Sequence, residues 1–334
     1  MPTLEVIEDL LRLRQIEPAW AALAEAVPSS TPFQLPPWQL TWWHHFGSGQ
    51  LRVFSWWEET LLIAIIPCFR HHWEGRRQLT LIGSGISDYL EPLLHPSHAN
   101  SILPQLQRYL QSSADWDICN WQDLAVNTPL HLLKGSLLED TICSEVPLTG
   151  NFEDFWQARP KDMRRNLRRY SERARSVAPI TFETTTSADE ELLDALICLH
   201  AARWEKRGES GMIAANNSSD FLRDIARQFA SRNMLRFFTI RFGEKVVALV
   251  LTFPYRETIY SYMSALDPDH EILGFGRTLL YEAIRYSYQY GYRAWNFCRG
   301  DEHYKFAWGA KPIEKRRLIL TRDTASSSPP PFGS

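Results

Sequence analysis

The two halves of the 334-residue chain repeat one order of elements. An extended stretch, a turn that contains proline, a helical stretch and a second extended stretch follow one another over residues 88–120, and the same order returns over residues 260–298. Internal similarity of this kind indicates two copies of one supersecondary unit. Because strands and helices alternate, and because the length fits two domains, the repeat predicts an α/β protein with two related units.

The two copies differ at the point where the second extended stretch ends. In the second copy, the strand Arg293–Cys298 ends at Arg299 and Gly300, and a polar run follows at once. Its members are Asp301, Glu302, His303, Tyr304 and Lys305. Ligands bind beyond the carboxyl ends of strands in open α/β folds, so we expect this run to lie in a crevice rather than in a solvated turn. The first copy has Gln122–Leu124 there, which indicates a structural or acceptor-shaping unit.

The run from Trp295 to Lys305, followed by Trp308, Gly309 and Ala310, resembles the signature of a bacterial branch of the GNAT superfamily. That branch comprises the acetyltransferases associated with cellulose and exopolysaccharide biosynthesis. It is similar in turn to the peptidoglycan aminoacyltransferases, which take amino acids from tRNA. The resemblance implies an α/β fold of tandem GNAT-like (acyl-CoA N-acyltransferase) domains, each a mixed, mostly antiparallel sheet flanked by helices.

The resemblance covers residues 152–320 and, more loosely, the N-terminal half, and it implies an order of domains. A degenerate GNAT-like domain is expected over residues 1–150, a basic linking helix over 151–178 and a catalytic GNAT-like domain over 179–322. Residues 323–334 are rich in serine and proline, a composition that predicts a disordered tail.

Acyl transfer to an amine needs a base for the nucleophile, stabilisation of the oxyanion and an acid for the leaving group. The resemblance implies that Tyr304 is the acid and that Lys305 stabilises the negative charge. The base stays open among Asp301, Glu302 and His303.

A turn with two glycines precedes the long helix over residues 274–290. In the GNAT fold, the turn after the fourth strand and the helix that follows offer backbone N–H groups to a pyrophosphate. Gly274 and Gly276 permit the close approach of an anion, and Arg277 adds positive charge. Glu271 departs from the common pattern of the superfamily, which has glutamine or arginine three residues before the first glycine.

A helix over residues 152–177 concentrates basic side chains against only two acidic ones within 161–175. On a helix, Arg164 and Arg168 share one stripe, which makes them candidates for binding the phosphates of a cofactor. The alternative is a solvated inter-domain helix. The basic residues are Arg159, Lys161, Arg164, Arg165, Arg168, Arg169, Arg173 and Arg175.

A further helix, ending near Lys206, contains a run that resembles the same family, in which this helix borders the acceptor site. The resemblance implies that His200, Arg203, Trp204 and Arg207 bind the substrate. A histidine on the apolar face of a helix is also typical of a packed core, and this alternative stays open for His200.

Composition excludes several classes of function. A net charge of −3 argues against non-specific nucleic-acid binding, so we expect no DNA partner. Five widely spaced cysteines without a CxxC pair predict reduced thiols and a cytoplasmic protein. The longest apolar run, residues 61–69, is too short for a transmembrane segment. Metal-ligand spacing, a serine nucleophile elbow and a Walker-type loop are all missing from the sequence, so we expect no metal.

Three hypotheses follow. The first is an N-acyltransferase that uses acyl-CoA, such as acetyl-CoA, as a co-substrate and has no permanently bound cofactor. It would modify a small-molecule amine or an amino sugar, in exopolysaccharide or cell-envelope biosynthesis. The second is an aminoacyl-tRNA-dependent transferase, which the arginine-rich helix favours and the acidic net charge disfavours. The third is a non-catalytic GNAT-like scaffold, against which the intact run Asp301–Lys305 argues.

Overall fold

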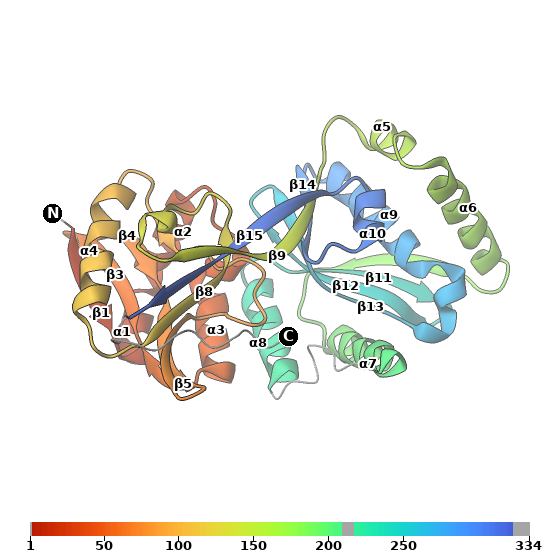
Figure 1. Ribbon diagram of the computed structural model, residues 1–334. Coiled ribbons are helices and arrows are strands. Elements are labelled where there is room, and N and C mark those ends of the chain that lie inside the picture. Colours follow the sequence, from red (N-terminus) through yellow and green to blue (C-terminus); the bar gives the residue numbers. More distant parts are fainter. Residues whose placement is uncertain (1, 209–216, 323–334) are drawn as a thin grey trace. The chain divides into compact units, whose positions relative to one another are not determined.

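The computed structural model describes residues 2–208 and 217–322 and divides into two compact units (Figure 1). Of the described residues, the first unit comprises 2–39, 47–140 and 315–322, and the second comprises 40–46, 141–208 and 217–314. The expected domains divided the chain differently. Residues 40–46 and 141–150 group with the second unit, residues 151–178 do not form a separate part, and the strand that begins before residue 315 continues into the first unit. The expected disordered tail, 323–334, lies outside the described residues.

The first unit contains two sheets. One sheet has the strand order β1-β3-β4-β7, and all of its neighbouring strands are antiparallel. In the other sheet, β5 pairs antiparallel with both β2 and β6. Strand β6 pairs in parallel with β8, and β8 pairs antiparallel with β15. The strands are β1 (Thr3–Ile7), β2 (Gln50–Leu51), β3 (Val53–Glu58), β4 (Leu61–Ile66), β5 (Cys68–Trp73), β6 (Arg76–Leu81), β7 (Leu93–Leu94), β8 (Ile118–Ala125) and β15 (Lys311–Thr321). The helices are α1 (Leu10–Gln15), α2 (Glu17–Ala26), α3 (Pro36–Phe46) and α4 (Ala99–Ser112), with 3₁₀ turns η1 (Pro32–Gln34) and η2 (Pro129–Leu132).

Helix α4 shows why this part of the chain folds as it does. Its apolar residues recur three or four positions apart, and Ile102, Leu103, Leu106 and Leu110 are all buried. Burial of each such side chain contributes about 1.5–3 kcal/mol. They pack into one cluster with Trp121 of β8, and this cluster is the core that the helix covers.

The second unit has one sheet, in the order β10-β11-β12-β13-β14-β9, in which only the pair β13–β14 is parallel among the described strands. Its strands are β9 (Ser136–Pro147), β10 (Ile180–Thr185), β11 (Arg236–Phe242), β12 (Lys245–Tyr255), β13 (Thr258–Leu266) and β14 (Ala294–Arg299). Its helices are α5 (Phe152–Gln157), α6 (Lys161–Arg175), α7 (Glu190–Arg207), α8 (Ser218–Ala230), α9 (Phe275–Gln289) and α10 (His303–Ala307), with a 3₁₀ turn η4 (Pro268–Leu273). Helices α7 and α9 lie on opposite faces of the strands β11–β13 (Figure 1).

The sequence predicted this framework closely. Strand β12 is buried from Val246 to Tyr255, as expected for a central strand, and α9 runs over the predicted helix with Leu279, Ala283 and Ile284 buried. Two expectations were wrong. Residues 89–94 extend a sheet only at Leu93 and Leu94, because residues 89–92 adopt no regular structure. The single basic helix expected over residues 151–178 is divided into α5 and α6, with a break before Lys161 at Pro160.

The parallel pair β13–β14 opens at its C-terminal side. Its register runs from Thr258 opposite Ala294 to Tyr260 opposite Asn296, although β13 continues to Leu266 and β14 to Arg299. The cause lies in β14, where Cys298 has a φ of +58° and its N–H donates to the side chain of Asn296 at 2.8 Å. A register shift against β9 occurs at the same point, and such a bulge bends a strand. The two strands therefore end apart.

Among residues 2–208 and 217–322, no helix is long and apolar enough to cross a membrane.

Candidate active site

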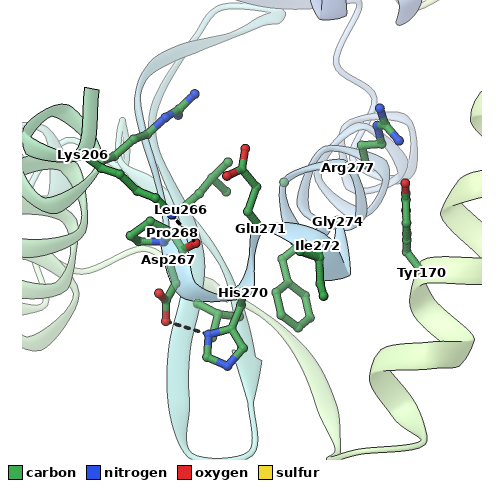
Figure 2. A pocket seen from close by; sticks show the side chains of 14 residues that line it. Tyr170, Lys206, Leu266, Asp267, Pro268, His270, Glu271, Ile272, Gly274 and Arg277 are labelled. Atoms are coloured by element: carbon green, nitrogen blue, oxygen red, sulfur yellow. Dashed lines mark hydrogen bonds and ion pairs between the residues drawn. The ribbon is translucent and has the colours of Figure 1, made fainter. Parts of the chain in front are cut away.

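A cavity of about 470 Å³ lies in the second unit, where β13 ends and η4 leads into α9 (Figure 2). Its walls come from α6, α7, β12, β13 and the first turn of α9. The lining residues are Tyr170, Arg203, Lys206, Val247, Leu266, Asp267, Pro268, His270, Glu271, Ile272, Gly274, Phe275, Gly276 and Arg277.

Asp267 fixes the turn that forms the floor of this cavity. Its carboxylate, 3% exposed, accepts hydrogen bonds from the Asp269 N–H at 3.0 Å and from Nδ1 of His270 at 2.9 Å, and it pairs with Nζ of Lys245 at 2.7 Å. Burial alone would raise the pKa of Asp267, but these three partners outweigh it and hold the pKa below its ordinary value. The residue is therefore an ionised cap that holds η4 in place.

Two glycines allow other elements to approach the start of α9. Gly274 has a φ of +66°, and a Cβ there would lie 2.7 Å from Cδ2 of Tyr170; a Cβ on Gly276 would lie 3.0 Å from Cδ1 of Leu266. The N–H groups of Arg277 and Thr278 donate to the carbonyl of Gly274 at 3.0 and 3.3 Å, whereas the N–H groups before them have no acceptor within the helix by helical geometry. The glycines thus let Tyr170 and Leu266 come close to the positive end of α9, which itself borders the cavity.

Positively charged side chains lie on both sides of the turn η4. Figure 2 shows Lys206 of α7 on one side and Arg277 of α9 with Tyr170 of α6 on the other, with Glu271 between them. Nζ of Lys206 donates to the carbonyl of Pro268 at 3.2 Å, which ties α7 to η4. The arrangement suits an anionic group, although the carboxylate of Glu271 opposes it.

The predicted cofactor-binding residues divide into two groups. Gly274, Gly276 and Arg277 line the cavity, whereas Arg164 and Arg168 are not among its lining residues. Arg164 donates to the carbonyl of Arg159 at 3.3 Å and to the side chain of Gln157. Arg168 pairs with Glu172 at 3.2 Å, and its side chain is 84% exposed.

The predicted substrate-binding residues lie along α7. Arg203 lines the cavity. His200 is 7% exposed and accepts a hydrogen bond at Nε2 from Nε1 of Trp204 at 2.9 Å. Burial, with a smaller effect of the positive charge of Arg203, lowers the pKa of His200 to about 4, so its ring is neutral. Arg207 is the last residue of α7, and its side chain lies outside the described part of the chain.

Lys305, predicted to stabilise an oxyanion, is 2% exposed and closes the end of β14. Its Nζ donates to the carbonyls of Arg299 at 2.6 Å, Gly300 at 3.2 Å and Phe297 at 3.4 Å, and it pairs with Glu302 at 2.9 Å. Together these partners hold the strand end and the start of α10 in one arrangement.

The other predicted catalytic residues follow the strand end. Asp301, Glu302 and His303 are exposed, and Tyr304 is 44% exposed. None of the run Asp301–Lys305 is among the residues that line the cavity, so the expectation that the run lies in a crevice was wrong: apart from the buried Lys305, its side chains are exposed to solvent. Desolvation of the Tyr304 hydroxyl and the nearby charge of Glu302 raise its pKa, while the charge of Arg203 acts in the opposite direction. Arg203 is thus close enough to act on Tyr304 and also lines the cavity, so it links the polar run to the cavity wall.

The sequence analysis did not single out Tyr170, Lys206 or His270, which also line the cavity. For Lys206 a signal was present, because it lies three positions after Arg203 on one helix face. Tyr170 carries no such signal, since its place in the wall depends on how α6 packs against Gly274.

One cluster among the described residues has the donor set of a metal site. His44 and His45 of α3 and Asp224 of α8 place one ligand atom each within 4.8 Å of one another. None of the three lines the cavity, and Nε2 of His45 already lies 2.8 Å from Oδ2 of Asp224.

Comparisons with known proteins agree with this geometry. Residues 161–306 match a family model described as an acetyltransferase (GNAT) domain. The crystal structure of FemX superposes on 95% of this chain and 97% of its own with a TM-score of 0.66 at 11% identity. L-PGS from Bacillus licheniformis gives 0.56 at 11% identity over 85% of this chain and 90% of its own. A protein of unknown function from Bacteroides thetaiotaomicron gives 0.54 at 14% identity over 96% and 100%.

No curated protein matches the chain. At these identities the structural likenesses show the fold. The predicted fold class, an α/β protein of tandem GNAT-like units, is confirmed, and the segment that matches the acetyltransferase domain contains the whole cavity.

Proposed function

We propose that this protein is an N-acyltransferase that moves an acyl group from acyl-CoA to the amine of a small molecule or an amino sugar, in exopolysaccharide or cell-envelope biosynthesis. The observation that carries the proposal is the cavity at the end of β13, which is lined by the positive end of α9 at Gly274 and Gly276 and by Arg277. Backbone N–H groups at a helix start, together with an arginine, form a site for a pyrophosphate. Acyl-CoA carries a pyrophosphate, which supports it as the donor.

The gap between β13 and β14 would take the acyl arm of the donor. The amine nitrogen of the acceptor forms a bond to the acyl carbonyl carbon, and the carbon–sulfur bond to coenzyme A breaks. The raised pKa of Tyr304 keeps its hydroxyl protonated, so it can give a proton to the leaving thiolate. The base that takes the proton of the amine comes from Asp301, Glu302 or His303.

Lys305 has a positioning role in this proposal. Because its amine already has three carbonyls and a carboxylate as partners, it holds the end of β14 rather than the reacting oxygen. His200 and Trp204, joined by a hydrogen bond on α7, border the acceptor together with Arg203. A cytoplasmic location is part of the proposal, and the five free cysteines, all within the described residues, support it.

Calorimetric titration with acetyl-CoA tests the donor. Arg277→Ala is expected to weaken binding about tenfold, as the loss of a hydrogen bond to a charged group would. Arg285→Ala is the matched control, because Arg285 lies on the same helix, pairs with Glu282 and does not line the cavity. Absence of saturable binding to acetyl-CoA and to longer acyl-CoAs would reject the proposal.

An aminoacyl-tRNA donor is the second candidate. The observation that favours it is α6, whose side chains Arg165 and Arg168 are 70% and 84% exposed. Binding of aminoacyl-tRNA by a protein that does not bind acyl-CoA would decide for this candidate.

A further inference from the structure

We infer that Arg169 and Tyr170 of α6, together with Arg277 of α9, form a subsite for the 3′-phosphorylated adenosine end of the donor. The inference rests on the proposed function and deepens it. It assigns a role in recognising coenzyme A to α6, which is separate from the sheet and from the helices α7 and α9 that cover it.

The first argument is the docking of α6 on the cavity wall. Tyr170 lines the cavity, and its Cδ2 would lie 2.7 Å from a Cβ on Gly274. Any other residue at position 274 would therefore have to displace this ring. Tyr170 forms the wall at the place where the donor pyrophosphate is proposed to bind.

The second argument is the pair of guanidinium groups around Tyr170. Cζ of Arg277 lies 5.7 Å from the centre of the Tyr170 ring, and Cζ of Arg169 lies 5.3 Å from it. Both distances fall within the range of cation–π contacts. Rings and guanidinium planes of this kind stack on nucleobases, and arginine binds phosphate through two parallel hydrogen bonds.

The third argument is the distribution of charge on α6. Arg165 pairs with Asp162 at 2.8 Å, and Arg168 pairs with Glu172 at 3.2 Å, so two of the arginines have carboxylate partners on their own helix. Arg169 instead lies against the ring of Tyr170, which lines the cavity. Its charge is directed to the cavity wall rather than to an acidic side chain of the helix.

The fourth argument is the direction of the donor. Arg203 lines the cavity on the α7 side and acts electrostatically on Tyr304, so the acyl end belongs on that side. Tyr170 and Lys206 lie on opposite sides of η4 (Figure 2). With the pyrophosphate at the start of α9, the nucleotide end leaves on the side of Tyr170, toward Arg169.

The test compares coenzyme A with 3′-dephospho-coenzyme A by calorimetry. The wild-type protein is expected to prefer coenzyme A by about fivefold, the size of one exposed ion pair, and Arg169→Gln is expected to abolish that preference. Arg165→Gln, which removes the same charge from the same helix, is expected to keep it. An equal preference in wild type and Arg169→Gln, or none in wild type, would overturn the inference while leaving the proposed function intact.

A second variant tests the ring. Tyr170→Leu is expected to weaken binding of both coenzyme A and 3′-dephospho-coenzyme A several-fold and to leave binding of 4′-phosphopantetheine, which lacks the adenosine, unchanged. Equal losses for all three ligands would mean that Tyr170 shapes the cavity and does not touch the nucleotide. If the wild-type protein binds none of the three, the proposed function fails and the inference fails with it.

Discussion

The two units differ in the size of the cavity that lies at the end of their parallel strand pairs. Each contains a parallel strand pair, β6–β8 in the first and β13–β14 in the second. At the end of β13 lies the cavity of about 470 Å³, whereas the cavity near the end of β6 measures about 10 Å³. The small cavity is lined by Trp20, Gln34, Gln39, Ile65, Pro67, Leu81, Ile82, Leu90, Glu91 and Leu93.

Side chains account for the contrast. In the first unit, Leu90 and Leu93 fill the space, and the one carboxylate there is occupied internally: Glu91 accepts from the N–H of Ala125 at 2.8 Å and from the hydroxyl of Thr128 at 2.6 Å. In the second unit, Gly274 and Gly276 line the cavity and have no side chain that could extend into it. The same strand arrangement therefore yields a packed core in one copy and room for a ligand in the other.

Removing the proposed acid is expected to have the largest effect. Tyr304→Phe should lower the rate of thiol release from acetyl-CoA, measured with a panel of amines, about 10²- to 10⁴-fold, the usual contribution of acid–base catalysis. Its acetyl-CoA affinity should stay unchanged. Gln122→Ala should leave the rate unchanged; the sequence repeat aligned Gln122 with the polar run, but it lies inside β8. A comparable loss in Gln122→Ala would place chemistry in the first unit as well.

Removing a buried side chain beside the small cavity of the first unit should lower the stability of the protein and leave acetyl-CoA binding unchanged. Leu90 is 3% exposed, and Leu90→Ala is expected to lower the free energy of unfolding in urea by about 2–5 kcal/mol, the usual cost of a buried leucine. Acetyl-CoA affinity of the folded variant should match that of wild type. A loss of affinity in protein that is still folded would show that the first unit takes part in donor binding.

Glu271→Gln should increase the affinity of the cavity in the second unit for acetyl-CoA. Glu271 lines the cavity with its negative charge, and removing a repulsion of about 1 kcal/mol should tighten acetyl-CoA binding about fivefold. High salt should shrink the difference. Weaker binding in the variant would mean that Glu271 contacts the donor favourably, for example through a hydroxyl of its ribose.

The smallest effects concern pH, and their signs oppose each other in the two units. The pKa of Asp267 is lowered in the fold by its partners, so its contribution to stability is present above the ordinary pKa of about 3.9 and is lost as the pH falls through the folded value. Desolvation raises the pKa of Glu91 against its hydrogen bonds, so its contribution is present below about pH 4.3 and is lost as the pH rises through the folded value.

Urea unfolding between about pH 3 and pH 7 measures both effects. In Asp267→Asn, the free energy of unfolding should fall less than in wild type as the pH is lowered. In Glu91→Gln, the decrease in the free energy of unfolding that wild type shows as the pH rises should be absent. Identical profiles for wild type and Asp267→Asn would show that the pKa of Asp267 is the same in the folded and unfolded states, so that its partners do not stabilise the ionised form.

Local patterns allowed much of the fold to be predicted from the sequence. The apolar run at Val246–Leu251 and the periodicity of 274–290 predicted β12 and α9, because burial of apolar side chains decides both elements. The two glycines at the start of α9 were also recognised from local sequence, and Gly274 has the positive φ that glycine adopts without strain.

The partners of the charged residues escaped the sequence analysis, although most of them lie nearby in the chain. Helical spacing grouped Arg164 with Arg168, but their acceptors, on Gln157 and Glu172, lie on their own part of the chain. The charge of Lys305 suggested a reacting group, whereas the fold surrounds its amine with carbonyls of the strand end. Tyr170 enters the cavity wall only because α6 packs on η4 and α9.

The pairing of β8 with β15 has a consequence for biosynthesis. The edge of β8 receives its partner from Lys315–Thr321, which the ribosome makes roughly 190 residues after Ala125. At about 5–20 residues per second, the first unit waits about 10–40 s with an unpaired strand edge. Open edges of this kind pair readily with other chains. The nascent first half is thus exposed to pairing with other chains until Lys315–Thr321 has been made.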